Sequence, residues 1–598
     1  MSRDAFAADI SRHVWETKYR FRGAPDDVTI EGTWRRIARA LAAVESDPAW
    51  ERRFYDALAE FKFLPGGRIH AGAGTGRRVT LFNCFVMGAI EDSLEGIFDA
   101  LREGALTMQQ GGGVGYDFST LRPRGSVAKA VGGIASGPVS FMRIWDATCA
   151  TLLSTGARRG AMMATLRCDH PDILAFIEAK QVPGELRNFN LSVLVTDELM
   201  RAVEADADWL LVFPGEADGG EAVSRRWSGS PGPTPCRVYA RLRARELWDR
   251  LMHATYEHAE PGVLFIDRIN HWNNLHYRER ISATNPCGEI PLPPYGACDL
   301  GSINLVAFVR EPFTPRAALD LESIEAVTRI AVRMLDDVID VSRFPLQRQA
   351  EVVRGARRVG LGITGLADAL IMLGLHYADP AARELAGRAM RRICHASYRC
   401  SIDLAREKGA FPHFERQPYL SGAFIATLPQ DIRDGIARDG IRNSHLTAIA
   451  PTGTISLLAN NVSSGIEPVY QFRHRRRMLE LDGTAAEHDL VDYALERWLA
   501  LRGAEPPPSS FVTALDLTPS EHVEMQATLQ PYVDNSISKT INVPTDFPFA
   551  DFDGVYRQAF ERGLKGCTTY RPNRITGAVL EPLESTASLC CTPEREPD

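Results

Sequence analysis

The sequence predicts an α/β protein in which a small helical domain precedes an α/β barrel. Two observations lead to this class. The first part of the chain carries apolar residues at helical spacing. Farther along, short apolar segments alternate with longer helical patterns, as expected for strands that are connected through helices. We therefore expect a helical domain over residues 1–78, a barrel over 79–572 and a flexible tail over 573–598.

Helical periodicity defines the N-terminal part. Two apolar faces recur at intervals of three and four residues, one formed by Trp34, Ile37, Ala38, Leu41 and Ala42 and the other by Phe54, Leu58 and Phe61. Strand-like runs follow at residues 83–87, 191–195 and 360–366, and a long helical pattern covers 327–339. A glycine run at 109–115 lacks the lysine of a phosphate loop, so we interpret it as backbone that lies close to a neighbouring strand or ligand.

Composition restricts the class of partner. The chain has 598 residues, of which 45% are hydrophobic and 24% charged, and its formal net charge is -8. This charge argues against a nucleic-acid polymer as partner and is compatible with nucleotides that are held at local sites. No run of about 18 apolar residues occurs and no secretory leader is visible, so we expect no membrane span and a cytoplasmic location.

The cysteines argue against a metal or disulfide scaffold. All 11 are scattered and none forms a CxxC pair. Cys168, Asp169 and His170 are metal-ligand types, but adjacent residues cannot easily converge on one ion, and no second ligand pair follows. We expect no metal site, and we expect Asp169 to cap the helix that begins near Pro171.

The stretch with the most specific chemistry is 285–292, which reads Asn-Pro-Cys-Gly-Glu-Ile-Pro-Leu. Pro286 removes a backbone donor and Gly288 can adopt a left-handed backbone, so we expect a tight loop instead of a strand interior. If this segment is extended, alternation aims Asn285, Cys287 and Glu289 the same way, and an amide, a thiol and a carboxylate share one small volume. Few structural loops need that combination, which favours a catalytic role.

This loop resembles the active-site finger of ribonucleotide reductases, and with the segments below the resemblance extends over nearly the whole chain. It implies a ten-stranded barrel of two antiparallel five-stranded halves, with the finger at its centre. It also implies the radical reduction of ribonucleoside diphosphates to 2′-deoxyribonucleoside diphosphates. Cys287 would carry the thiyl radical, Glu289 would be the general base on the 3′-hydroxyl, and Asn285 would bind the sugar hydroxyls.

The same resemblance assigns the electron donors. Loss of the 2′-hydroxyl as water requires two electrons, which Cys84 and Cys298 would supply by closing a disulfide. Near the C-terminus, Cys590 and Cys591 would pass electrons to this pair from a thioredoxin or glutaredoxin-like reductant. Relatives usually separate these two cysteines by a few residues, whereas here they are adjacent.

A second binding segment lies at 450–459. Small and hydroxyl residues run into an apolar helical stretch, so the free amides of a helix N-terminus would face a diphosphate. Simple helix capping by a threonine is the alternative. In the family this loop grips the substrate's diphosphate, and the matching residues are Pro451, Thr452, Gly453, Thr454 and Ser456.

A third region resembles the family's allosteric site, where a deoxynucleotide or ATP effector controls specificity beside a dimer interface. The candidate residues are Glu91, Asp92, Arg122 and Arg158, because forked arginine donors match phosphate oxygens. A solvated charged surface is the alternative for each arginine. The resemblance implies a homodimer.

The radical source is inferred from what this sequence has at two positions. Oxygen-dependent relatives relay the radical through two adjacent tyrosines, where this chain has Thr568 and Thr569. The anaerobic class needs a glycine within an aromatic-flanked motif, and Gly577 lacks the aromatic residue. Adenosylcobalamin remains as the expected cofactor. The alternatives are a large subunit that needs a di-metal small subunit, and a nucleotide-sensing relative that has lost catalysis.

Overall fold

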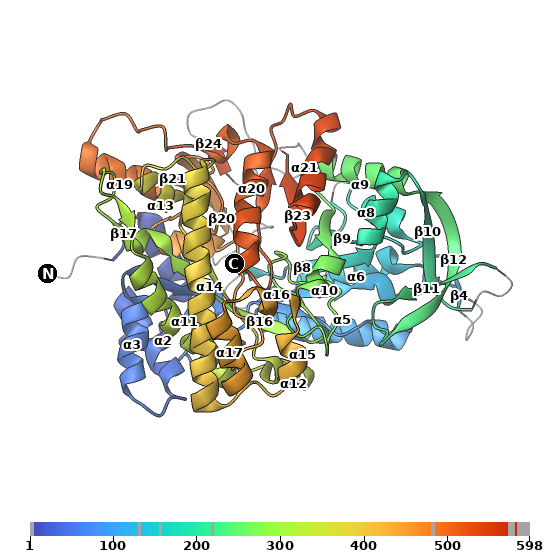
Figure 1. Cartoon of the computed structure of the whole chain (residues 1–598), viewed down its shortest axis with the longest axis horizontal. Helices are drawn as coiled ribbons and strands as arrows, with labels where there is room; N and C mark the ends of the chain where they lie inside the picture. The colour runs from blue at the N-terminus through green and yellow to red at the C-terminus, as the bar shows by residue number, and fades with distance from the viewer. Residues whose placement is uncertain are drawn as a thin grey trace.

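The structure is a computed structural model, and it describes residues 5–128, 133–154, 158–182, 184–216, 220–479, 485–571 and 580–582. The N-terminal part is helical, as predicted, and is formed by α1 (Asp9–Val14), α2 (Ile30–Ala42), α3 (Ala49–Leu58) and α4 (Gly67–Gly72) (Figure 1). The Thr29 hydroxyl caps α2 by accepting a hydrogen bond from Gly32 N. The buried face of α2 contains the predicted residues Trp34, Ile37, Ala38 and Leu41.

Five parallel strands form the first half of the central sheet. In spatial order they are β2 (Cys84–Val86), β3 (Gly113–Asp117), β8 (Met162–Arg167), β9 (Phe189–Val195) and β13 (Gly262–Phe265). Their buried, mostly apolar sequences suit strands that are covered on both faces. The sheet continues into a second half in which the chain direction reverses.

The second half contains β16 (Ala297–Asn304), β19 (Val359–Thr364), β22 (Thr540–Asn542) and β23 (Gly566–Tyr570). It meets the first half through antiparallel pairs, β16 with β2 and β23 with β13. Parallel bridges from Leu361 to Thr447 and from Ile449 to Ile537 join β19 to the segment that leads into β22. Together with β1 (Phe63–Pro65), which lies on β16, the largest sheet has ten strands and curls into a barrel, in agreement with the expected fold.

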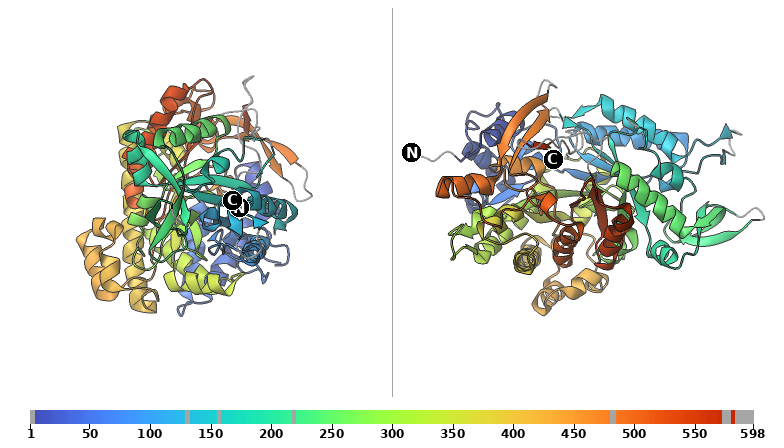
Figure 2. Two further views of the ribbon diagram at one scale, coloured as in Figure 1. Left: turned by 90° about the vertical axis from the view of Figure 1, so that its right-hand side faces the viewer. Right: turned by 90° about the horizontal axis from the view of Figure 1, so that it is seen from above.

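Long helices surround the barrel (Figures 1 and 2). They are α5 (Leu94–Gln109), α6 (Pro138–Thr151), α9 (Ala244–His258), α11 (Leu321–Val341), α14 (Pro380–Lys408), α20 (Pro519–Leu529) and α21 (Phe549–Glu561). A three-stranded sheet, β10 (Asp208–Pro214), β12 (Pro233–Arg243) and β11 (Ala222–Arg226), lies at the right of Figure 1. No helix in the described ranges is both long and apolar enough to cross a membrane.

Shorter elements connect these parts. The other described α-helices are α7 (Ile173–Ile177), α8 (Asp197–Glu204), α10 (Ile266–His271), α12 (Gln347–Ala356), α13 (Leu366–Met372), α15 (Arg416–Leu420), α16 (Ala423–Thr427), α17 (Gln430–Asp439), α18 (Gly453–Leu458) and α19 (Tyr493–Arg502). The other strand pairs and sheets contain β4 (Val127–Ala128), β5 (Gly133–Ile134), β6 (Leu153–Ser154), β7 (Arg158–Arg159), β17 (Val309–Arg310), β18 (Ala318–Leu319), β20 (Arg473–Leu479), β21 (Ala485–Val491) and β24 (Leu580–Pro582).

A hairpin inside the barrel carries the finger. Its strands are β14 (Ala283–Thr284) and β15 (Pro291–Leu292), and its tip is residues 285–290. Asn190 on β9 donates a 2.8 Å hydrogen bond to Pro286 O, and Ser536 N donates one of 2.9 Å to Glu289 O. The glycine run lets the finger approach β3 closely, since a Cβ at Gly115 would lie 1.8 Å from Thr284 O. The interpretation of that run as close backbone approach is therefore confirmed.

Candidate active site

The finger tip is a turn. Gly288 has a φ of +80° and donates from its N–H to Asn285 O at 3.1 Å. Ile290 N donates to Asn285 Oδ1 at 3.0 Å, which fixes the amide. The expected tight loop is present, but the extended alternation is wrong, because the turn separates the side chains. Cys287 is half-buried and lines a cavity, whereas Asn285 and Glu289 are buried behind it.

Asn285 and Glu289 converge on Cys84. Asn285 Nδ2 donates to Cys84 Sγ at 3.2 Å, and Cys84 Sγ donates to Glu289 Oε1 at 3.8 Å. These contacts join residues that are 201 and 205 positions apart in the chain. An amide, a thiol and a carboxylate do share a small volume, although the thiol is Cys84 and not Cys287.

Glu289 has the electrostatics of a general base. It is 1% exposed, and burial raises the pKa of its carboxyl to about 7, while hydrogen bonds from Asn285 and Cys84 oppose this effect. Within the described part of the chain, Oε2 has no hydrogen-bond partner. A buried carboxyl group with one oxygen left for a ligand, and with a pKa near neutrality, can accept a proton from a bound substrate.

Cys84 and Cys298 lie directly opposite each other on antiparallel strands β2 and β16. Directly opposed residues place their Cβ atoms about 4.5–5.5 Å apart on one face of a sheet, which is near the spacing of a disulfide. Both residues are thiols in this structure. Cys298 Sγ donates to Asp299 O at 3.2 Å, and burial raises the pKa of this thiol well above its ordinary value. Cys84 and Cys298 are therefore placed to close a disulfide.

The cavity at Cys287 has a volume of about 420 Å³. Both halves of the barrel line it, from β9 and β13 on one side and β22 and β23 on the other. Of the predicted phosphate-binding residues, Pro451, Gly453 and Ser456 lie on its wall. Thr452 and Thr454 are buried and do not line the cavity. The space fits a nucleotide-sized ligand.

The loop before α18 is held by hydroxyl groups. Thr452 adopts a left-handed backbone with a φ of 58°, and its side chain makes no capping bond to α18. Instead, Thr452 Oγ1 accepts from Gly465 N at 2.8 Å, and Ser456 Oγ lies 3.0 Å from Ser464 Oγ. These contacts join the loop to the companion segment 461–468, which also lines the cavity. Threonine capping therefore does not account for Thr452.

Lys539 anchors the other end of the companion segment. Its ammonium group donates to Glu467 Oε2 at 2.5 Å, to His522 Nδ1 at 2.9 Å and to Thr540 O at 2.6 Å. Because His522 Nδ1 accepts, His522 carries its proton on Nε2, which faces Ala514 O at 3.2 Å. No role for Lys539 could be predicted from the sequence, because no local pattern reveals its partners.

The candidate effector residues are only partly brought together. Arg122 Nε donates to Asp92 Oδ2 at 2.7 Å, and Arg122 N donates to Asp92 Oδ1 at 3.1 Å. Glu91 accepts from Ser93 Oγ at 3.2 Å. The side chain of Arg158 and the tail residues Cys590 and Cys591 lie outside the described residues.

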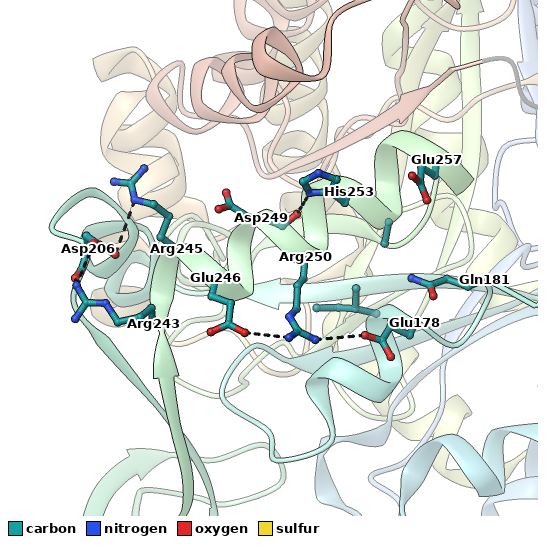
Figure 3. A pocket seen from close by; sticks show the side chains of 12 residues that line it. Glu178, Gln181, Asp206, Arg243, Arg245, Glu246, Asp249, Arg250, His253 and Glu257 are labelled. Atoms are coloured by element: carbon teal, nitrogen blue, oxygen red, sulfur yellow. Dashed lines mark hydrogen bonds and ion pairs between the residues drawn. The ribbon is translucent and has the colours of Figure 1, made fainter.

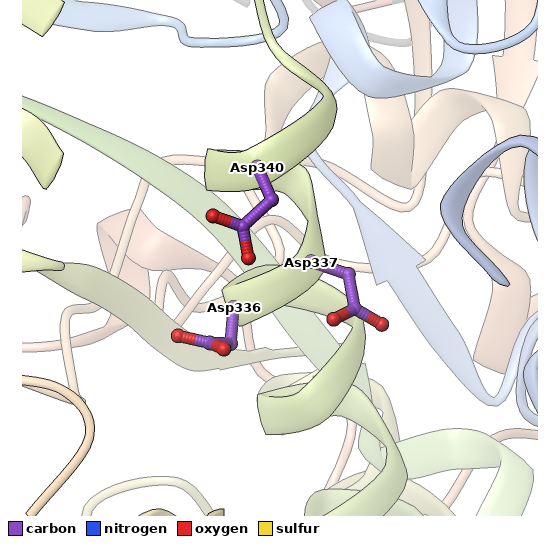
Figure 4. Close-up of side chains that lie close together, drawn as sticks. All are labelled: Asp336, Asp337 and Asp340. Atoms are coloured by element: carbon purple, nitrogen blue, oxygen red, sulfur yellow. The ribbon is translucent and has the colours of Figure 1, made fainter. Parts of the chain in front are cut away.

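Three aspartates on α11 resemble a metal site (Figure 4). Asp336 and Asp340 pair with Arg357 at 2.8 Å, and Asp337 pairs with Lys408 at 2.6 Å. Since these cations already neutralise the carboxylates, the cluster is an ion-pair network and needs no metal.

The expected cap at Asp169 is wrong. Its carboxylate forms a two-pronged ion pair with Arg167, with contacts of 2.8 and 2.7 Å. The N-cap residue of α7 is Asp172, which makes no side-chain capping bond. A buried arginine needs a bidentate carboxylate partner more than a five-residue helix needs a cap.

A second concavity, of about 510 Å³, lies along α9 (Figure 3). Its charged residues pair among themselves, since Arg250 contacts Glu246 at 3.0 Å and Glu178 at 3.6 Å, and Arg243 contacts Asp206 at 3.1 Å. None of the predicted catalytic residues lines it, whereas Cys287 lines the cavity of about 420 Å³.

The barrel has a central finger with a thiol at its tip, and a pair of thiols lies beside a buried carboxyl group. This arrangement defines a radical nucleotide reductase. The family model "Ribonucleotide reductase, barrel domain" matches residues 82–570, and "Ribonucleotide reductase, all-alpha domain" matches residues 5–78. The chain belongs to the ribonucleotide reductase family.

Particular relatives narrow the class. The chain is 38% identical over 583 residues to "Vitamin B12-dependent ribonucleoside-diphosphate reductase" of Mycobacterium tuberculosis (strain CDC 1551 / Oshkosh), covering 94% of this chain and 78% of the relative. It is 35% identical over 574 residues to the protein of the same name from Thermoplasma acidophilum, covering 93% and 69%. It is 27% identical over 595 residues to "Ribonucleoside-diphosphate reductase subunit alpha" of Chlamydia muridarum, covering 90% and 56%.

Proposed function

We propose that this chain is a vitamin B12-dependent ribonucleoside-diphosphate reductase, which converts ribonucleoside diphosphates to 2′-deoxyribonucleoside diphosphates for DNA synthesis. One observation carries the proposal. The finger presents Cys287 to a nucleotide-sized cavity and holds Asn285 and Glu289 against Cys84, which lies opposite Cys298. The similarity to B12-dependent diphosphate reductases over most of the chain supports the substrate and the cofactor.

The finger residues divide the chemistry. A ribose C–H bond is too weakly acidic for a side-chain base, so a thiyl radical on Cys287 removes the 3′-hydrogen atom. Glu289 then accepts the proton of the 3′-hydroxyl, which becomes more acidic beside a carbon radical. Asn285 hydrogen-bonds the sugar hydroxyls. At the end, Cys287 returns the hydrogen atom to C3′.

The thiol pair supplies the two electrons. Oxidation of Cys84 and Cys298 to a disulfide releases two electrons and two protons, and the 2′-hydroxyl leaves as water. The balance is one diphosphate substrate and two thiols giving one deoxynucleotide, one disulfide and one water. Cys590 and Cys591 then reduce this disulfide back to two thiols, using electrons that they receive from an external dithiol of the thioredoxin or glutaredoxin type.

The phosphate end of the substrate lies at the wall formed by Pro451, Gly453 and Ser456. The free amides at the start of α18 and the nearby hydroxyls suit an anion. Thr452 and Thr454 act from behind the wall by shaping the loop. This assignment follows from the position of the loop, which shares the cavity with Cys287.

The residues around the cavity fit adenosylcobalamin as the radical source. Ala259, Tyr470 and Tyr570 pack together on the cavity wall and would hold apolar parts of the cofactor. When bound, the cofactor would supply the carbon radical that is needed to oxidise the Cys287 thiol. Thr568 lines the cavity and Thr569 bonds Tyr556 OH at 3.0 Å, and threonine hydroxyls cannot relay an electron hole.

A second copy of the chain is proposed to cover α5. Leu94, Phe98 and Leu106 are 65%, 52% and 38% exposed on this helix, at spacings that make one apolar stripe. The Asp92 to Arg122 pair lies just before it. A dimer through α5 would place the effector site, with Glu91, Asp92, Arg122 and Arg158, beside the interface. We also propose a cytoplasmic location, where cellular thiols would keep the cysteines that the reaction uses reduced.

The test is turnover by the purified chain with a ribonucleoside diphosphate, dithiothreitol and adenosylcobalamin. Deoxynucleotide should form without any partner subunit, and Cys287→Ser should form none. Without external thiol, one turnover should leave Cys84 and Cys298 joined in a disulfide that peptide mapping detects. A chain that becomes active only when a di-metal subunit is added would refute the cofactor assignment.

A further inference from the structure

A group of buried charged and polar side chains lies outside the cavity wall. Its members are Arg358, Tyr398, His445, Asp534 and Lys565, each at most 3% exposed. The proposed reaction uses none of them. Burying charged groups is costly, so their retention needs a reason beyond general packing.

Lys565 makes an unusual set of contacts. It lies directly before β23, and its Nζ donates to Asp534 O at 2.6 Å and also to Asn535 O. A lysine that donates to two consecutive backbone carbonyls fixes the course of that backbone. Burial lowers the pKa of Lys565 to about 7, with the charge of Asp534 opposing this effect and that of Arg358 adding to it.

The Asp534 carboxylate binds a different stretch of backbone, at residues 446–447. It accepts from Leu446 N at 2.8 Å, from Thr447 N at 2.9 Å and from Tyr398 OH at 2.7 Å. Lys565 and Asp534 together therefore hold two stretches of backbone, one at residues 534–535 and the other at 446–447.

Both stretches lead into the active site. Ser536, one residue beyond the carbonyls held by Lys565, donates its N–H to Glu289 O at 2.9 Å. Ile449 N donates to Ser536 O at 3.1 Å, and Ser538 N donates to Ile449 O at 2.8 Å. Ile449 comes two residues before Pro451, which is on the cavity wall. Lys565 is thus linked through hydrogen bonds of the backbone to the proposed base and to the diphosphate loop.

We propose that Lys565 is a positioning residue of the reductase reaction, whose ammonium group fixes the backbone at residues 534–536 and thereby the position of the Glu289 carboxylate. This inference rests on the proposed function for the role of Glu289. The contact of Lys565 with the two carbonyls can be tested without turnover.

The experiment compares Lys565→Met with Lys408→Met in the full chain. Lys408 is the control, because it is a partly buried lysine that bonds Glu45 and Asp337 and does not line the cavity. In Lys565→Met, kcat should fall about tenfold to a hundredfold, since small displacements of a catalytic group cost this much. KM for the diphosphate should change less than about threefold, since the cavity wall stays in place. Lys408→Met should lower Tm without changing either constant.

Hydrogen exchange provides the second readout. Peptides that contain Ser536 should exchange faster in Lys565→Met than in the unaltered chain, and should not do so in Lys408→Met. An unchanged kcat in folded Lys565→Met, or equal loss of kcat in both variants, would overturn the inference. If the unaltered chain shows no reductase activity, the proposed function fails, and unchanged exchange at Ser536 would separately refute the contact.

If Lys565→Met does not fold, a third variant, Lys565→Gln, tests the proposal instead. Lys565→Gln keeps an N–H donor, but its shorter side chain cannot reach both carbonyls. A lowered kcat with retained KM in this variant supports the proposal. Full kcat in this variant contradicts it.

Discussion

Glu289 on the finger and Asp336 on α11 are both fully buried carboxyl groups, at 1% and 0% exposure, yet their surroundings are opposite. Among the described residues, the Glu289 carboxyl group accepts a hydrogen bond from a thiol and none from a cation, and burial raises its pKa to about 7. Burial also raises the pKa of Asp336, but Arg357 and Arg442 overcome this effect, and its pKa lies below the ordinary value.

The difference shows that partners, and not burial alone, decide what a buried carboxyl group can do. Asp336 is a permanent anion that ties α11 to Arg357, Arg442 and Asn443. Glu289 can gain or lose its proton near neutral pH, as a general base must. The following predictions test this contrast, from the largest expected effect to the smallest.

Removing the Glu289 carboxylate should lower kcat, whereas removing the Asp336 carboxylate should not. Glu289→Gln keeps the shape of the side chain and removes the base, so kcat should fall by about 10²–10⁴-fold. Asp336→Asn should retain kcat in the folded fraction, because Asp336 does not line the cavity. Steady-state kinetics with adenosylcobalamin measure both. Comparable losses of kcat in the two variants would remove the functional contrast.

The same two variants should change stability in opposite directions. Asp336→Asn leaves Arg357 and Arg442 without their buried anion, and it should cost about 3–5 kcal/mol. At pH 8, Glu289→Gln removes a carboxylate that is costly to charge, and the shift from 4.5 to about 7 corresponds to about 3 kcal/mol of stabilisation at most. Thermal unfolding at pH 8 should show Tm falling for Asp336→Asn and rising for Glu289→Gln.

Stability should also depend on pH with opposite signs. The folded-state pKa of Glu289 is raised, so its contribution is present at low pH and is lost as pH rises through about 7. The folded-state pKa of Asp336 is lowered, so its contribution is present above the unfolded pKa and is lost as pH falls. Subtracting the Tm profile of each variant from that of the unaltered chain measures these terms. Two differences of the same sign would contradict the assignments.

Activity should follow the Glu289 proton. Because the base must be deprotonated, kcat/KM should rise about tenfold per pH unit below a midpoint near 7 and then level off. Asp336→Asn should show the same midpoint in the kcat/KM profile. A midpoint near 4.5 would indicate that burial does not control this carboxyl group.

The smallest expected effect concerns Asn285. Its hydrogen bonding lowers the pKa of Glu289, so Asn285→Ala should move the kcat/KM midpoint upward by less than about one unit. Asn190→Ala is the control, because Asn190 holds Pro286 O and makes no contact with the carboxyl group. If the kcat/KM midpoint shifted equally in both variants, the cause would be increased mobility of the finger and not the lost hydrogen bond.

Much of the architecture could be read from the sequence. Helical spacing at Trp34 and Ile37 predicted the N-terminal helices, and apolar runs predicted β9 and β19. Pro286 and Gly288 predicted a tight loop, and a turn is present. The strand number, the roles of the finger residues and the pairing of Cys84 with Cys298 followed only from resemblance to the family.

The sequence alone determined the local structure of this protein, because spacing, proline and glycine act within a few residues. Only the tertiary structure decided the electrostatics. The pKa of Glu289 depends on burial and on Cys84, which lies 205 residues away. The partners of Lys565 and Asp336 likewise come from distant segments. Barrel closure brings these groups together, and no pattern in a short stretch of sequence records which of them will meet.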